Sequence, residues 1–140
     1  MNMTLKIALR DGEKLVVNGA VLRSVGRTEL CVENNVSLLR GREIMSPQEA
    51  STPAKRLYYA CMVAYIDPDG ATAHHDEIIE YLRDLIGALA SPEAKAVCAS
   101  FARKVATGDF YRALADCRAL INYETVLLSP IDDRTFERVQ

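Results

Sequence analysis

The spacing of apolar residues changes near residue 46, and this change limits the folds open to the 140-residue chain. Before residue 46, apolar and polar residues alternate, which places one face of a β-strand in a core. From residue 53 onward, apolar residues recur every three or four positions, as on the buried side of a helix. Strands followed by helices predict an α+β fold. We expect an N-terminal small antiparallel β-meander or curved sheet packed on a C-terminal bundle of about four helices.

The first 45 residues read as four or five short strands. Residues 5–9 alternate between apolar and polar side chains, and Asp11-Gly12 is a hairpin-type turn sequence. Asn18-Gly19 is either a second tight turn or a bulge within a longer strand, and the sequence does not separate these alternatives.

Two Ser/Thr-Pro pairs mark the junction between the two patterns. Residues 46–49, Ser-Pro-Gln-Glu, match a capping box with proline at the first helical position. Thr52-Pro53 then starts another helix almost at once. Residues 57–66 of that helix are apolar on nearly every side, which is typical of a helix covered by several neighbours. We therefore expect the helix to be the centre of packing.

Three more helical segments follow. Residues 78–89 carry an apolar stripe, Ser91-Pro92 begins the next helix, and Thr107-Gly108-Asp109 separates that helix from a last one. The final pair resembles one hairpin of a tetratricopeptide array. Such arrays need about three stacked repeats. With one hairpin visible, simple packing is favoured over a peptide-binding groove.

Length and composition predict a single domain over residues 1–140. Hydrophobic residues make up 49% of the chain and charged residues 26%, as in ordinary globular proteins. Within the domain we distinguish a β subregion (1–45), a helical subregion (46–128) and a charge-rich tail (129–140). The tail is expected to be flexible, either frayed or waiting for a partner.

The cellular location follows from cysteine usage and from hydrophobic segments. The four cysteines are far apart and lie among apolar neighbours, so we expect buried, reduced thiols; they are Cys31, Cys61, Cys98 and Cys117. The charged N-terminal segment does not match a signal peptide, and the apolar run 57–66 is too short to cross a bilayer. We expect a cytoplasmic protein without a membrane partner.

Nothing in the sequence indicates an enzyme. His74 and His75, followed by two acidic residues, form the one cluster that hints at catalysis or a metal. Adjacent helical residues point in different directions, so surface histidines near a helix start are favoured. No motif for a nucleophile, a zinc ligand set or a phosphate-binding loop is present. We expect no catalytic residue, no metal and no cofactor.

The basic residues of the β subregion are the better candidates for a site. Residues 1–45 contain seven bases and five acids, whereas the remaining residues are acidic and the whole chain has a net charge of −2. A basic strand face could contact phosphates, although a solvated face that prevents strand-edge pairing would carry the same charges. The candidate RNA-binding residues are Arg10, Lys14, Arg23, Arg27, Arg40 and Arg42.

Three tyrosines on the apolar helix have two interpretations. Tyr58, Tyr59 and Tyr65 could stack on bases or anchor a protein partner. Apolar neighbours surround them in sequence, so we expect at least two of the three to fill the core.

Three collinear segments resemble the flagellum biosynthesis repressor FlbT family. They are LKIALRDGEKLVVNGAVLR, STPAKRLYYACMVAYIDPDG and GDFYRALADCRALI, and the likeness is collinear over roughly residues 5–128. The resemblance implies a post-transcriptional regulator that acts on the 5′ untranslated region of flagellin mRNA and lowers translation or promotes decay. It also implies a companion protein, FlaF, with the opposite effect.

Two hypotheses follow from the resemblance. In the first, the domain binds the flagellin mRNA leader directly through its basic strands. In the second, it is a protein-binding adaptor or chaperone-like factor that contacts flagellin or FlaF and acts on the transcript indirectly. The negative net charge and the lack of a known RNA-binding aromatic motif favour the second, whereas the family description favours the first, which we rank higher. Self-association into a homo-oligomer stays open.

Overall fold

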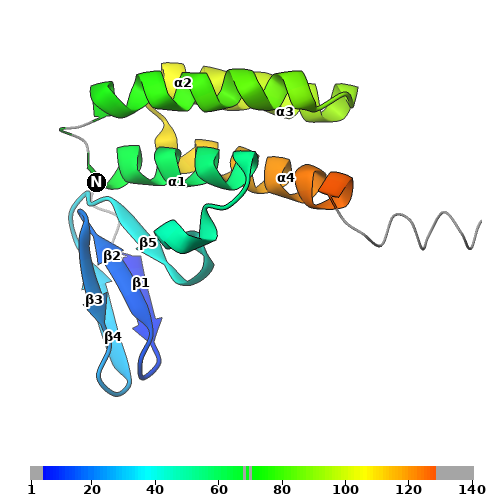
Figure 1. Ribbon diagram of the computed structural model, residues 1–140. Coiled ribbons are helices and arrows are strands. Elements are labelled where there is room, and N and C mark those ends of the chain that lie inside the picture. Colours follow the sequence, from blue (N-terminus) through cyan, green and yellow to red (C-terminus); the bar gives the residue numbers. More distant parts are fainter. Residues whose placement is uncertain (1–4, 68, 70, 129–140) are drawn as a thin grey trace, which may run out of the picture.

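The computed structural model describes residues 5–67, 69 and 71–128, and it confirms the α+β fold (Figure 1). Five strands come first: β1 (Leu5–Leu9), β2 (Lys14–Val17), β3 (Ala20–Arg23), β4 (Thr28–Val32) and β5 (Leu38–Arg40). Two short 3-10 helices follow, η1 (Gly41–Glu43) and η2 (Pro47–Glu49). Four α-helices complete the described part: α1 (Pro53–Ile66), α2 (Ala71–Ala88), α3 (Pro92–Ala106) and α4 (Phe110–Leu128).

The strands form two small antiparallel sheets and are not connected as a simple meander. β1 pairs with β4, whereas β2 lies between β3 and β5. Asn18-Gly19 is a tight turn, because Val17 pairs with Ala20 and both turn residues have positive φ, 50° and 88°. Asp11-Gly12 also forms a turn, but it joins strands of different sheets.

The three-stranded sheet has an apolar side chain on each face. Leu15 packs with Ile7 and Leu9 of β1 in a small core between the strands. Val16, the next residue, belongs with Leu39 to the main core that the helices form. Successive side chains of a strand point to opposite faces, so β2 connects the two cores.

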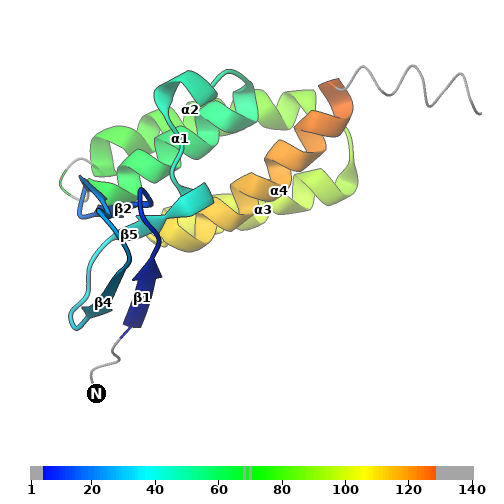
Figure 2. The same ribbon diagram turned by 90° about the horizontal axis from the view of Figure 1, so that it is seen from below.

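The helices pack as a four-helix bundle beside the strands. α1 packs against α2 and α4, and α3 packs against α4. In Figures 1 and 2 the strands extend from one end of this bundle, below α1. Seven residues of α1 are buried: Ala54, Leu57, Tyr58, Ala60, Cys61, Met62 and Ala64. The expectation that this helix is the centre of packing is confirmed.

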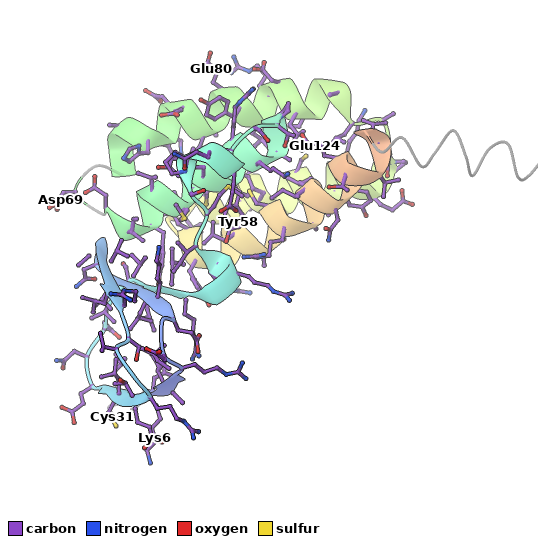
Figure 3. All side chains as sticks on the ribbon, turned by 60° about the horizontal axis from the view of Figure 1, so that its bottom comes forward. Lys6, Cys31, Tyr58, Asp69, Glu80 and Glu124 are labelled. Atoms are coloured by element: carbon purple, nitrogen blue, oxygen red, sulfur yellow. The ribbon has the colours of Figure 1, made fainter. Side chains whose placement is uncertain are left out.

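Glu124 of α4 caps the N-terminus of α1. Its side chain is only 4% exposed, its Oε2 accepts a hydrogen bond from the Ala54 backbone N–H at 2.8 Å, and its Oε1 accepts one from the Thr52 hydroxyl. Thr52 Oγ1 in turn accepts from Lys55 N–H at 3.3 Å. The first N–H groups of a helix have no partner within the helix, and a carboxylate is favourable at that end of the helix dipole. Figure 3 shows Glu124 among the helices.

Two hydrogen bonds connect α1 to β5 and to η1, which directly follows β5. The Tyr65 hydroxyl accepts a hydrogen bond from the Leu38 backbone N–H at 2.9 Å, and the Tyr58 hydroxyl donates to the Glu43 carbonyl at 2.7 Å. The Asn18-Gly19 turn also lies close to the helix, because a Cβ added at Gly19 would be 3.3 Å from the Ile66 carbonyl oxygen. The opposite ends of β2 and β3 therefore lie away from α1.

Removal of the Glu124 carboxylate is expected to destabilise the fold. In Glu124→Ala the buried Ala54 N–H loses its acceptor, which costs about 1–3 kcal/mol of unfolding free energy. Glu80→Ala, which removes an exposed acid from α2 (Figure 3), is the control and should change stability by about 0.5 kcal/mol or less. Urea unfolding measures both variants. Equal stability of the two would show that the cap is not needed.

Candidate nucleic-acid interface

The structure divides the six candidate RNA-binding residues into three groups. Arg10, Arg27 and Arg40 line one hollow, Lys14 and Arg23 face each other across the β2–β3 hairpin, and Arg42 lies on η1. The fold therefore brings three of the six side chains to a common hollow and places the other three outside it.

Two turns form the strand end that carries the hollow. The turn at Asp11-Gly12 is tied to the turn around Gly26, because the Gly26 N–H donates to Asp11 Oδ1 at 2.8 Å and the Gly12 N–H donates to the Ser24 carbonyl at 2.8 Å. Figure 1 shows both turns at the end of the strands that points away from the helices. The hollow beside them has a volume of about 470 Å³ and is open to solvent.

The hollow has an excess of positive charge. Besides its three arginines, it is lined by one acid, Glu13. Arg40 is held in place, since its guanidinium donates to the Ala8 carbonyl at 3.1 Å and lies 4.0 Å from Glu13 Oε2. Among the residues that the structure describes, the exposed side chains of Arg10 and Arg27 have no ion-pair partner. Two free guanidinium groups beside a fixed third match the planar, bidentate recognition of phosphate.

Lys14 and Arg23 form a second basic position. They are directly opposite each other on β2 and β3, an unfavourable arrangement for like charges. Lys14 precedes Leu15, which pairs with Arg40, so Lys14 and Arg40 lie on opposite faces of the sheet. The pair is therefore near the hollow along the chain and is not part of it.

The sequence did not predict a third surface with basic residues, where Glu43 of η1 lies beside α1, α3 and α4. Lys104, Arg112 and Arg118 line a hollow of about 390 Å³ together with Tyr58 and Tyr111. Their cations already have partners in the fold, which makes the surface a weaker site for an anion. Lys104 lies 2.9 Å from Asp116, Arg112 lies 3.5 Å from Asp109, and Arg118 donates to the Arg42 carbonyl and to the Tyr58 hydroxyl.

The tyrosines of α1 are mainly structural, as expected. Tyr58 is buried, and Tyr59 and Tyr65 pack against the core. Burial raises the pKa of Tyr58, and the neighbouring Arg118 partly offsets this increase.

Tyr111 of α4 is exposed, and the sequence analysis did not predict a role for it. Its hydroxyl donates to Glu43 Oε2 at 2.5 Å, and this hydrogen bond raises the pKa of Tyr111 to about 12.

The histidine pair lies near the start of α2. His74 Nε2 is 3.8 Å from Asp67 Oδ2, and both histidines are partly buried. Within residues 5–67, 69 and 71–128, no three His, Cys, Asp or Glu side chains gather in a way that could hold a metal ion.

None of the helices in the described part of the chain combines the length and hydrophobicity that a membrane crossing needs.

The prediction of four buried thiols was wrong for Cys31. Cys61, Cys98 and Cys117 are buried on the helices, whereas Cys31 of β4 is exposed and pairs with Lys6 on the outer strands (Figure 3). The two-stranded sheet is covered on one face only, so alternate residues of β4 face solvent. Burial raises the pKa of Cys61 to about 12 and also raises the pKa values of Cys98 and Cys117.

Thiol labelling tests whether Cys31 is exposed while the other three cysteines are buried. At pH 8 a disulfide reagent such as dithionitrobenzoate should modify one thiol of the native protein rapidly, because only thiolates attack and three of the four thiols are buried with raised pKa values. Cys31→Ser should remove the fast phase and leave slow reactions limited by opening of the helical core. Any fast-reacting thiol in the Cys31→Ser variant would contradict the described burial.

Comparison with known proteins places the chain in a family. The model of the family described as "Flagellar protein FlbT" matches residues 5–128. The flagellum biosynthesis repressor protein FlbT of Caulobacter vibrioides is 36% identical over 123 residues, which cover 87% of each chain. The probable repressor FlbT 1 of Bradyrhizobium diazoefficiens is 36% identical over 127 residues, or 89% of this chain and 85% of the relative. No solved structure matches the chain.

A more distant relative agrees with this placement. The probable flagellum biosynthesis repressor protein FlbT of Agrobacterium fabrum is 31% identical over 129 residues, 92% of this chain and 87% of the relative. The matched region contains all five strands and all four α-helices of the described structure. The chain therefore belongs to the FlbT family, and the predicted resemblance is confirmed.

Proposed function

We propose that the protein represses flagellum biosynthesis at the level of flagellin mRNA, by binding the 5′ untranslated region of that transcript. Two observations support the proposal. The relatives that align with this chain over most of their length are named flagellum biosynthesis repressors. In addition, a basic hollow lies at the end of the strands that points away from the helices. The basic hollow is the observation on which the hypothesis of direct RNA binding depends.

The chemistry of the hollow suits an RNA backbone better than a base. Arg10 and Arg27 are exposed, unpaired in the described part of the chain and fixed at their backbones by the tied turns. Guanidinium groups of this kind neutralise phosphates without reading sequence. Specificity for the leader would then depend on RNA shape or on neighbouring contacts.

Binding alone would be sufficient for repression. A protein that covers the ribosome-binding segment lowers translation, and one that holds the leader open exposes it to nucleases. Neither route needs a catalytic group here. The cytoplasm, where the transcript is translated, is the compartment in which we place this activity.

A second candidate is an adaptor that contacts flagellin or FlaF and affects the transcript indirectly. One observation favours it: the edge strand β3 exposes Val21 and Leu22, and the adjacent Val25 is 83% exposed. Apolar side chains beside an unpaired strand edge can accept a strand from a partner. The negative net charge also fits a protein partner.

Titration of a flagellin leader RNA across a salt series tests direct binding. Affinity should fall steeply with salt because phosphate contacts release counterions. The double variant Arg10→Ala/Arg27→Ala should lower affinity about tenfold or more and reduce the slope of log affinity against log salt by about two. Arg40 is left unchanged because it also holds Ala8 and Glu13.

The matched control is Lys14→Ala/Arg23→Ala, which removes the same charge outside the hollow. It should weaken binding less and leave the slope closer to that of the unchanged protein. Equal losses in the two double variants would contradict a localised footprint. No binding at low salt, together with co-purification of flagellin or FlaF, would replace the direct mechanism with the adaptor.

A further inference from the structure

A second hollow, which we call the tyrosine hollow, lies at the opposite end of β1 from the basic hollow. Its volume is about 430 Å³, and it is lined by Tyr65 of α1, Tyr111 of α4 and the β4–β5 loop residues Asn34 and Asn35. Four aliphatic side chains, among them Leu5 of β1, complete the lining, which contains no charged residue of the described part of the chain. The tyrosine hollow therefore suits a neutral group, in contrast to the basic hollow.

Hydrogen bonds hold both tyrosine rings in place. The Tyr111 hydroxyl donates to Glu43 Oε2, and the Tyr65 hydroxyl accepts from the Leu38 backbone N–H at 2.9 Å. The two ring centroids are 5.3 Å apart, and the ring planes are tilted by 41°. Tyr111 is nevertheless 45% exposed. Because the exposed ring is already fixed, it loses little conformational entropy when a planar group stacks on it.

Asn34 and Asn35 supply hydrogen-bonding groups beside the rings. Both residues are exposed, and each side-chain amide has two donor hydrogens and a carbonyl acceptor. Proteins bind an unpaired RNA base by stacking it on an aromatic ring and by hydrogen-bonding its edge. Two fixed tyrosines, two exposed amides and an aliphatic lining match both requirements.

Two strands connect the tyrosine hollow to the basic hollow. β1 contributes Leu5 to the tyrosine hollow and Leu9 to the basic hollow. In the same way, β5 contributes Leu38 to the first and Arg40 to the second. At about 3.3 Å per strand residue, these separations are about 13 Å along β1 and about 7 Å along β5. A nucleotide advances a strand by about 3.4 Å in a duplex, so a few nucleotides span the distance between the hollows.

The Glu43 carboxylate joins the two surfaces. Its Oε1 accepts a hydrogen bond from the Arg40 backbone N–H at 3.0 Å, and its Oε2 accepts from the Tyr111 hydroxyl. Arg42 lies between Arg40 and Glu43 in the sequence and is exposed. This candidate RNA-binding residue, which is outside the basic hollow, therefore lies on the segment that connects the two hollows.

We propose that the tyrosine hollow binds one unstacked nucleobase of an RNA whose phosphates occupy the basic hollow. The base stacks on the Tyr111 ring, and the Asn34 and Asn35 amides form hydrogen bonds to its edge. This inference rests on the proposed function and adds to it the base contact that the arginines do not make. Since base contacts specify sequence and phosphate contacts do not, the tyrosine hollow is where the protein distinguishes one RNA from another.

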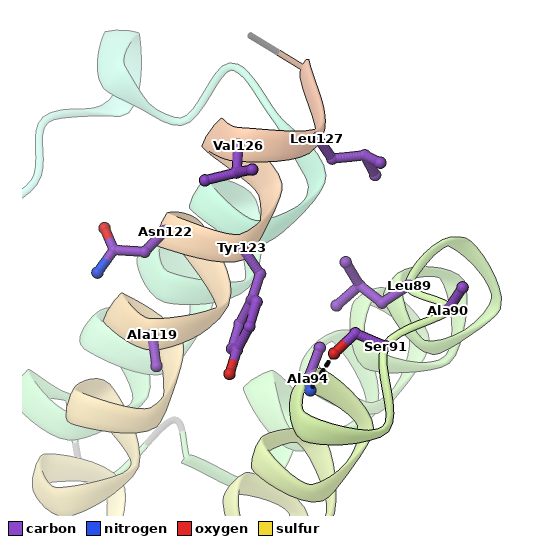
Figure 4. Close-up of a pocket in the computed structure, with 9 residues that line it drawn as sticks. All are labelled: Leu89, Ala90, Ser91, Ala94, Ala119, Asn122, Tyr123, Val126 and Leu127. Carbon is purple, nitrogen blue, oxygen red and sulfur yellow. Dashed lines mark hydrogen bonds between the residues drawn. The ribbon is translucent and has the colours of Figure 1, made fainter. Parts of the chain in front are cut away.

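An apolar groove between α3 and the C-terminal half of α4 supplies matched controls. Its volume is about 640 Å³, and Tyr123 and Asn122 line it (Figure 4). Tyr123 lies about 18 Å along α4 from Tyr111 at 1.5 Å per helical residue. The groove therefore offers a tyrosine and an asparagine at a distance from the tyrosine hollow.

A tryptophan at position 111 reports stacking, because the chain contains no tryptophan of its own. Flagellin leader RNA should quench the fluorescence of Tyr111→Trp with the same midpoint as binding measured by mobility shift. Tyr123→Trp should bind the RNA equally well and keep its fluorescence. RNA binding without quenching of Tyr111→Trp would overturn the base site and leave the proposed function standing.

A salt series separates stacking from charge. Tyr111→Ala should lower RNA affinity about tenfold and leave the slope of log affinity against log salt unchanged, because no phosphate contact is lost. Tyr111→Phe, which keeps the ring, should bind nearly as well as the unchanged protein. Asn34→Ala/Asn35→Ala should also weaken binding at constant slope, whereas Tyr123→Ala and Asn122→Ala should not weaken it.

Two results of the salt series would overturn the base site alone. They are equal losses in Tyr111→Phe and Tyr111→Ala, and equal losses in Tyr111→Ala and Tyr123→Ala. Failure of the unchanged protein to bind the RNA at low salt would instead overturn the proposed function and the base site together.

Discussion

The burial of α1 is the constraint on which the rest of the structure depends. Its residues pack against α2 and α4, and its tyrosines form hydrogen bonds to β5 and η1, so both the helices and the strands are attached to it. Glu124 closes its N-terminus and Tyr65 holds β5 near its C-terminal end. A helix with so little polar surface is stable in water only when neighbours cover it, and here α2 and α4 supply most of that cover.

This arrangement separates the two surfaces to which we assign roles. The Asn18-Gly19 turn lies against the C-terminal end of α1, so the opposite strand ends, with Arg10 and Arg27, project away from the bundle. The tyrosine hollow lies beside the start of α4, so the length of β1 separates it from those arginines.

The sequence predicted the helices well because their signals are local. Ser/Thr-Pro pairs and the 3.6-residue period mark α1 and α3 within one or two residues. Strand pairing is not local, and so the pairing of β1 with β4 and the exposure of Cys31 were not foreseen. The same limit applies to the candidate site: the sequence shows that the strands carry basic residues, but only the fold shows that Arg40 lies beside Arg10 and Arg27. No local sequence pattern predicted the roles of Tyr111 and Glu124, because their hydrogen-bond partners are about seventy residues away in the sequence.

Hydrogen exchange of the full chain with and without flagellin leader RNA tests the central claim most directly. If the basic hollow is the RNA footprint, bound RNA should slow exchange in the two turns, residues 10–13 and 24–28, and leave α2 and α3 unchanged. Slower exchange confined to β3 or to the helices, or no change at an RNA concentration that saturates binding, would contradict the account.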